Sequence, residues 1–293
     1  MVNVRQVLPT TADGTLDWAA WVARVAAEYP QLAAQPLMNC CAWIQQQRSD
    51  QLAVSLELGE LVAELRLDTA SVLAALAYRS VRTERVSKAD LLTQIGAEAT
   101  DLVFSVAAMA TTSLLEMSDS PMLAKEQQSQ VENVKRMLAS MIDDARVAAI
   151  KLAERVLALR QAKDYEPQRR QRIAQEAGSI FSPLANRLGI WQLKWELEDL
   201  SLRYLREDIY LGIAKQLSQK RQQREQQVVA MTEHVVALLG DQGVSAEVEG
   251  RAKNIFSIWR KMQAKNIPIE EIYDVRAVRI IVDSLADCYA ALG

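Results

Sequence analysis

Residues 138–159, LASMIDDARVAAIKLAERVLAL, carry the clearest helical pattern in the chain. An α-helix has about 3.6 residues per turn, so apolar residues in steps of three and four share one face. The pattern predicts a long helix packed against a partner, with Ser129 as its N-cap and Pro167 just after its end. The apolar residues of this stripe are Leu138, Met141, Ile142, Ala145, Ala149, Leu152, Val156 and Leu159.

Residues from about 15 to 240 continue this helical character in both directions. The chain has only 10 Gly and 7 Pro among 293 residues, and scarce helix breakers favour long helices. Asp68 or Thr69 is the predicted N-cap of a helix that runs through Ala77. The segment 119–121, Asp-Ser-Pro, predicts a turn, and residues 209–239 predict one long helix or two.

The pattern changes after residue 240. Residues 244–249 alternate between apolar and polar, which predicts a half-buried strand, and 275–282 are β-branched and strand-like. A helix is expected between them, over about 253–263, and another over 285–292. We therefore predict a mainly α fold in which an all-helical domain (1–200) and connecting helices (201–240) precede the first strand–helix–strand of an α/β domain (241–293). About fifty residues are too few to complete such a domain, so we expect it to be incomplete here.

Composition narrows the function classes. Lys and Arg number 34 against 37 Asp and Glu, so the net charge of -3 gives no support for unaided nucleic-acid binding. Residues 215–224 are rich in Lys, Arg and Gln. This composition predicts a solvated helix face, with a phosphate-contacting patch as the alternative. Three cysteines without CxxC spacing, no signal-peptide pattern and no apolar run long enough to span a bilayer predict a cytoplasmic protein. The single histidine, His234, excludes a metal site that needs two histidines from this chain.

Residues 250–262, GRAKNIFSIWRKM, form the most suggestive constellation. Three cations and a hydroxyl meet there at a strand-to-helix connection: Arg251, Lys253, Ser257 and Lys261. This arrangement suits a polyphosphate, because the helix dipole and the free backbone N–H donors of the first turn add to the side-chain charges. The alternative is an ordinary amphipathic helix in which Ile255, Ile258 and Met262 are buried and the cations are solvated.

Asp274, at the start of the second predicted strand, is the candidate metal ligand. A carboxylate there could reach a Mg²⁺ ion bound to the same phosphates. The alternative is a turn or cap residue, since no second carboxylate stands out nearby.

Three blocks of this sequence resemble the long RelA/SpoT-family alarmone enzymes: 186–200 (NRLGIWQLKWELEDL), 250–262 and 273–279 (YDVRAVR). The resemblance implies an N-terminal HD-type hydrolase domain and then a synthetase domain with a nucleotidyltransferase-like fold. It also implies C-terminal domains, beyond this chain, that contact the ribosome and uncharged tRNA. Such a synthetase transfers pyrophosphate from ATP to the 3′-hydroxyl of GTP or GDP.

The hydrolase motifs of the family are altered in this chain. Active members carry a His-Asp pair after an Ala-Ala-Leu-Leu stretch, where this chain has Tyr78-Arg79, with Arg82-Thr83 further on. The family motif Lys-Leu-Ala-Asp-Arg-Leu-His-Asn reads KLAERVLA at 151–158. Arginines at these positions would repel Mn²⁺. We therefore expect a silent hydrolase domain, as in the synthetase-only, RelA-type branch of the family.

In the synthetase portion, the resemblance assigns ATP contacts to Arg251, Lys253, Ser257 and Lys261, and Mg²⁺ binding to Asp274. Lys253 and Asp274 would be the catalytic residues. The sequence leaves two other interpretations open. One is a catalytically incomplete regulatory or binding module that restrains or scaffolds a synthetase. The other is an alarmone hydrolase, which needs ligands that this chain lacks.

Overall fold

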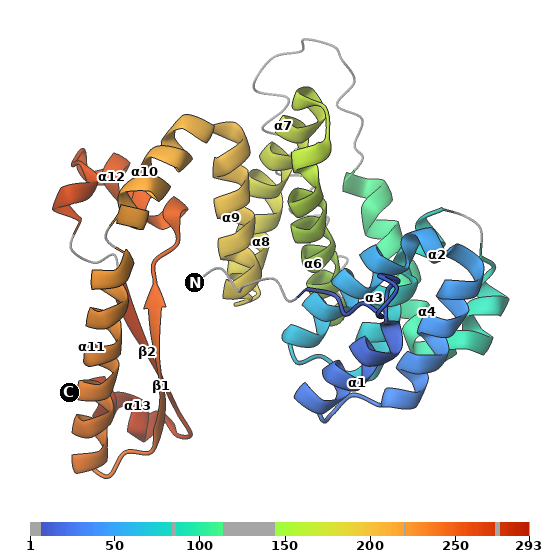
Figure 1. The fold of residues 1–293 in the computed structure, drawn as a ribbon, viewed down its shortest axis with the longest axis horizontal. Helices are drawn as coiled ribbons and strands as arrows, with labels where there is room; N and C mark the ends of the chain where they lie inside the picture. Colours follow the sequence, from blue (N-terminus) through green and yellow to red (C-terminus); the bar gives the residue numbers. More distant parts are fainter. Residues whose placement is uncertain (1–6, 84–85, 114–143, 220, 273–275, 293) are drawn as a thin grey trace. The chain divides into compact units, whose positions relative to one another are not determined.

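A computed structural model of the chain describes residues 7–83, 86–113, 144–219, 221–272 and 276–292 (Figure 1). The chain forms two compact units, Arg5–Leu197 and Glu198–Gly293. Within the described residues the regular elements are helices apart from two strands, which confirms the predicted mainly α class. None of the described helices is both long and apolar enough to cross a lipid bilayer.

The first unit is a helical assembly built around α3 and α6. Residues 71–78 of α3 are buried on every side, and so are residues 147–153 of α6. Helices that are buried all round lie in the middle of a helical core, and α2 supplies further core residues such as Leu52 and Leu56. The elements are α1 (Trp18–Glu28), α2 (Ala34–Glu64), α3 (Thr69–Arg82), α4 (Lys88–Ser113), α6 (Ala145–Gln161), α7 (Pro167–Glu176), α8 (Ser182–Arg187) and the start of α9 (Trp191–Leu205).

Helix α6 begins later than the apolar pattern predicts. Asp144 has non-helical backbone angles (φ -129°, ψ 114°), and its carboxylate accepts the Arg146 N–H at 2.9 Å, so it is the N-cap. The predicted continuous helix across Asp144 is therefore wrong, because an aspartate is stabilised more as a cap than inside a helix. From Ala145 onward the stripe forms α6 as predicted. Ser129, the stripe residues before Asp144 and the predicted turn at 119–121 lie outside the described residues.

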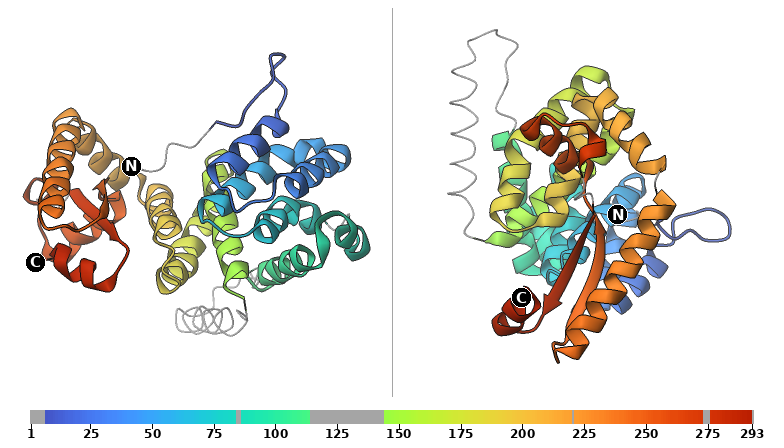
Figure 2. Two further views of the ribbon diagram at one scale, coloured as in Figure 1. Left: turned by 90° about the horizontal axis from the view of Figure 1, so that it is seen from below. Right: turned by 90° about the vertical axis from the view of Figure 1, so that its left-hand side faces the viewer.

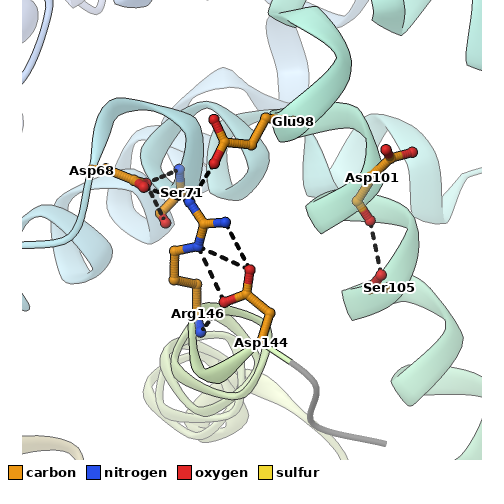
Figure 3. A network of polar contacts seen from close by, with 7 residues as sticks. All are labelled: Asp68, Ser71, Glu98, Asp101, Ser105, Asp144 and Arg146. Carbon is orange, nitrogen blue, oxygen red and sulfur yellow. Dashed lines mark hydrogen bonds and ion pairs between the residues drawn. The ribbon is translucent and has the colours of Figure 1, made fainter.

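Arg146 connects the beginnings of two helices with a third (Figure 3). Its guanidinium forms ion pairs with Asp68, with Asp144 at 2.7 Å and with Glu98 of α4 at 2.7 Å. Asp68, one of the two predicted alternatives, is the N-cap of α3 and accepts the Ser71 N–H at 2.9 Å. One arginine thus joins the N-caps of α3 and α6 to α4.

The second unit contains the end of α9 and a two-stranded antiparallel sheet along which α11 lies (Figure 2). Residues 209–239 form two helices, one of the two predicted alternatives. A Cβ atom on Gly250 would lie 2.1 Å from Cγ1 of Val228, so the close approach of α11 to β1 requires glycine there. The elements are α10 (Glu207–Gln219), α11 (Arg221–Asp241), β1 (Ala246–Ala252), α12 (Ile255–Lys265), β2 (Arg276–Val282) and α13 (Leu285–Leu292).

A small hydrophobic core joins α12 to α10. Its buried residues are Ile213 of α10, Ile258 of α12, and Ile269 and Ile272 of the connection that follows α12. This core holds the inner face of α12.

Candidate functional site

The predicted phosphate-binding residues lie along one strand-to-helix connection of the second unit. Arg251 lies in β1, paired with Ala277 of β2, and Lys253 lies between the end of β1 and the start of α12. Ser257 is the third residue of α12 and Lys261 follows one turn later. Asp274 lies outside the described residues, so its predicted metal-binding role stays a prediction.

The two faces of α12 differ in character. Ile255, Ile258 and Met262 pack in the core shared with α10. At about 100° per residue, Ser257 lies roughly 130° and Lys261 roughly 90° from the middle of that core face, so both flank the core and do not point into it. Amphipathic packing and phosphate binding therefore use different faces of the same helix, and the first does not exclude the second.

The N-terminus of α12 already holds an anion. The Asp199 carboxylate, which comes from α9, accepts the Phe256 N–H on Oδ1 at 2.7 Å and the Ile255 N–H on Oδ2 at 3.3 Å. The expectation that the first backbone donors of this helix are free for a phosphate is therefore wrong. A carboxylate satisfies them in this structure, as it commonly does at helix N-termini.

Asp199 titrates in an unusual range because it is buried. Asp199 is only 6% exposed, and this burial raises the pKa of its carboxyl group to about 6. The hydrogen bonds from Phe256 and Ile255 lower this pKa, and the neighbouring Glu198 raises it. The carboxylate form, which both N–H groups favour, consequently predominates at pH 7.

A second cluster lies in the first unit, at the positions that the family resemblance assigns to the hydrolase. Glu154 accepts from Lys151 Nζ at 3.0 Å and from Arg155 Nε at 2.7 Å. Arg155 also forms an ion pair with Glu176, at the end of α7, at 3.3 Å. Lys151 Nζ lies 5.9 Å from the centre of the Tyr78 ring. The cluster thus alternates cations and carboxylates.

Burial and the neighbouring charges together set the protonation states of this cluster. The Lys151 side chain is fully buried, and loss of solvation lowers the pKa of its ammonium group. Burial raises the pKa of Glu154, but Lys151 and Arg155 outweigh that effect and hold it well below the usual value. Burial raises the pKa of the Tyr78 hydroxyl to about 12, which keeps the phenol neutral.

This donor set does not fit an HD-type metal centre. A divalent metal needs carboxylate, imidazole or thiolate ligands, whereas the two carboxylates of this cluster, Glu154 and Glu176, are already paired with an ammonium and a guanidinium. Arg79 and Arg82, on the same helix as Tyr78, add further positive charge. Within the described part of the chain, no group of three or more His, Cys, Asp or Glu could hold a metal ion.

Two residues of these clusters were not assigned from the sequence. Asp199 belongs to the block 186–200 that carries the family resemblance, but nothing in the local pattern indicates a contact with α12. Glu176 is 21 residues from Arg155, and an acidic residue at a helix end gives no signal of a distant partner.

Comparison with known proteins agrees with the division of the chain into two units. A family model described as an HD domain matches residues 32–191, more than half of the chain. A second, described as a region found in RelA / SpoT proteins, matches residues 250–293. The chain belongs to the RelA/SpoT family.

Three curated relatives show how far this RelA/SpoT resemblance extends. The chain is 40% identical over 299 aligned positions to a GTP pyrophosphokinase of Escherichia coli (strain K12), a match that covers 100% of the chain and 40% of the relative. It is 44% identical to a GTP pyrophosphokinase of Photobacterium angustum (81% of the chain, 32% of the relative). It is also 36% identical to a probable guanosine-3′,5′-bis(diphosphate) 3′-pyrophosphohydrolase of Synechocystis (80% and 30%).

The RelA/SpoT chain thus spans about 40% or less of the length of these relatives. Each matched region contains one of the two clusters described above. The HD match includes the Lys151–Glu154–Arg155 network, and the RelA/SpoT match includes α12 and the connection before it.

Proposed function

We propose that this chain is the N-terminal part of a RelA-type enzyme that transfers pyrophosphate from ATP to the 3′-hydroxyl of GTP or GDP. The observation that carries the proposal is the RelA/SpoT match over 250–293, which covers Arg251, Lys253, Ser257 and Lys261. The GTP pyrophosphokinase names of the first relatives support it. Cytoplasmic location and ribosome binding through further domains belong to the same proposal.

In this proposal the cations of the strand-to-helix connection hold the ATP phosphates. Arg251 offers a forked pair of donors to phosphate oxygens, and Lys253 and Lys261 act as point charges. Their charge stabilises the transition state, because negative charge spreads over the phosphate oxygens during transfer. Ser257 supplies a hydroxyl hydrogen-bond donor on the same helix face as Lys261.

A divalent metal, Mg²⁺ in our proposal, would supply charge neutralisation between phosphate oxygens when bound. Asp274 is the residue that would hold it.

The same proposal includes a silent hydrolase domain. The buried cations Lys151 and Arg155 support it, because a divalent metal beside them would be repelled. Incubating the purified chain with Mn²⁺ and guanosine tetraphosphate should release no pyrophosphate. Mn²⁺-dependent release would refute this part of the proposal.

Calorimetric titration of the chain with ATP and Mg²⁺ tests the donor site. Lys253→Ala should weaken ATP binding about tenfold or more, which corresponds to a lost charge-assisted contact of about 1.5–3 kcal/mol. Lys265→Ala, at the exposed end of α12, is the matched control and should bind like the wild type. Absence of wild-type binding, or equal affinities for both variants, would contradict the assignment. We expect this span alone to form no product; in an assay of the full-length enzyme with ATP and GTP, product formation that survives Asp274→Ala would contradict the role of that residue.

A further inference from the structure

Asp199 holds both of the first backbone donors of α12. Its two carboxylate oxygens accept the N–H groups of Ile255 and Phe256, at 3.3 and 2.7 Å, from a residue 56 and 57 positions earlier in the chain. Asn254 occupies the N-cap position, but its side chain makes no capping hydrogen bond. The usual local cap is therefore replaced by a carboxylate from another helix.

The place of Asp199 is itself well fixed. Asp199 is 6% exposed, and Ser201 and Leu202, in the next turn of α9, are 3% exposed. A buried helix segment moves little, so its carboxylate is a fixed reference point for the first turn of α12.

The residues that the proposed function assigns to ATP lie on either side of this contact. Lys253 is two residues before Ile255, Ser257 directly follows Phe256, and Lys261 lies one turn further along α12. The core with α10 holds another face of α12, but a hydrophobic contact fixes the position of the helix along its axis less sharply than two directed hydrogen bonds do.

We propose that Asp199 is a positioning residue of the donor site, whose carboxylate fixes the start of α12 and thereby the places of Lys253, Ser257 and Lys261. This inference rests on the proposed function. Because Asp199 uses the first two helix donors, the phosphates are recognised by the side chains of the connection and not by those N–H groups.

Variants at Asp199 distinguish the effect of its hydrogen-bond geometry from the effect of its negative charge. Asp199→Asn removes the charge but keeps an oxygen that can accept the shorter bond, from Phe256. Asp199→Glu keeps the charge but lengthens the side chain by one CH₂ group, which displaces the carboxylate. Asp199→Ala removes both hydrogen bonds. Asp241→Ala, at the exposed end of α11, is the control.

The experiment is calorimetric titration of the full chain and these variants with ATP and Mg²⁺, together with amide hydrogen exchange of Phe256. We expect the Asn variant to bind within about twofold of the wild type, and the Glu and Ala variants to bind about five- to tenfold more weakly. Exchange at Phe256 should be slow in the wild type and the Asn variant and fast in the Ala variant. The control should match the wild type in both measurements.

The outcomes distinguish this inference from the function on which it rests. If the wild type does not bind ATP, the donor-site assignment fails and the inference fails with it. If the wild type binds and the Glu variant binds equally well, or the Asn variant loses as much affinity as the Ala variant, positioning is refuted while the donor site stands. Should the Ala variant not fold, the comparison of Asn with Glu still decides, because both keep an acceptor.

Discussion

Replacing Glu154 with glutamine should strongly destabilise the first unit. The substitution leaves two buried cations with less counter-charge, since Glu154 accepts from Lys151 at 3.0 Å and from Arg155 at 2.7 Å. Removing one partner of a buried ion pair costs about 3–5 kcal/mol. Arg155 keeps its pair with Glu176 at 3.3 Å, so we expect the lower end of that range, about 3 kcal/mol.

Lys151→Met is the matched variant, because it removes the other partner of the same contact. It removes an ammonium group that burial already disfavours, and Glu154 keeps two hydrogen bonds from Arg155, at 2.7 and 2.8 Å. We expect a loss of about 1 kcal/mol or less. The double variant Lys151→Met/Glu154→Gln should recover part of the loss, with a coupling energy of about 1–3 kcal/mol.

Urea denaturation followed by circular dichroism gives the free energy of unfolding of each variant. The folded-state pKa of Glu154 is lowered from 4.5 to about 2, so its contribution to stability is present above pH 4.5 and is lost as the pH falls toward 2. The glutamine variant should lack this part of the acid dependence. A glutamine variant within about 1 kcal/mol of the wild type, or one no less stable than Lys151→Met, would refute the reasoning.

Two further predictions concern packing and charge. Gly250→Ala should lower the melting temperature, because its Cβ would lie 2.1 Å from Val228 and push α11 from β1; Gly240→Ala, with no neighbour within 4 Å, should be neutral or stabilising by up to about 1 kcal/mol. Equal melting temperatures for the two would contradict the contact. Arg146→Met should cost about 1–2 kcal/mol in low salt and less in high salt, because three carboxylates lose their shared partner. Lys88→Met, which removes an exposed pair, should cost about 0.5 kcal/mol or less, and a similar loss in both variants would contradict a network effect.

The parts of the fold that depend on local patterns could be predicted from the sequence. Asp68 caps α3 as its position before an apolar helix indicates, and the final helix has the predicted bounds, Leu285–Leu292. The pattern failed at Asp144, because apolar periodicity continues across a cap residue that breaks the backbone helix. Periodicity reports which side chains can share a face, and the cap chemistry decides where the helix begins.

The candidate site could be predicted only in part, because local sequence patterns report local features and not contacts between distant residues. The strand-to-helix connection that carries Lys253 and Lys261 is a local feature, so the change of period revealed it. The contact of Asp199 with the start of α12 joins residues more than fifty positions apart, and no short pattern encodes it. The sequence therefore predicted that the cations share one connection, and their role stays a prediction, but it wrongly left the N–H groups of Ile255 and Phe256 free.

The charge balance of the buried network in the first unit supports a helical domain that folds without a metal. Lys151 and Arg155 each carry one positive charge, and Glu154 and Glu176 each carry one negative charge, so the four side chains sum to zero. A centre built from histidines and carboxylates has an excess of electron-pair donors that a metal ion must satisfy. In this chain, the cations of Lys151 and Arg155 satisfy the carboxylates of the network instead. An added divalent ion would upset this balance. Under the proposed function, metal-dependent chemistry belongs to the second unit, at the connection that carries Lys253 and Lys261.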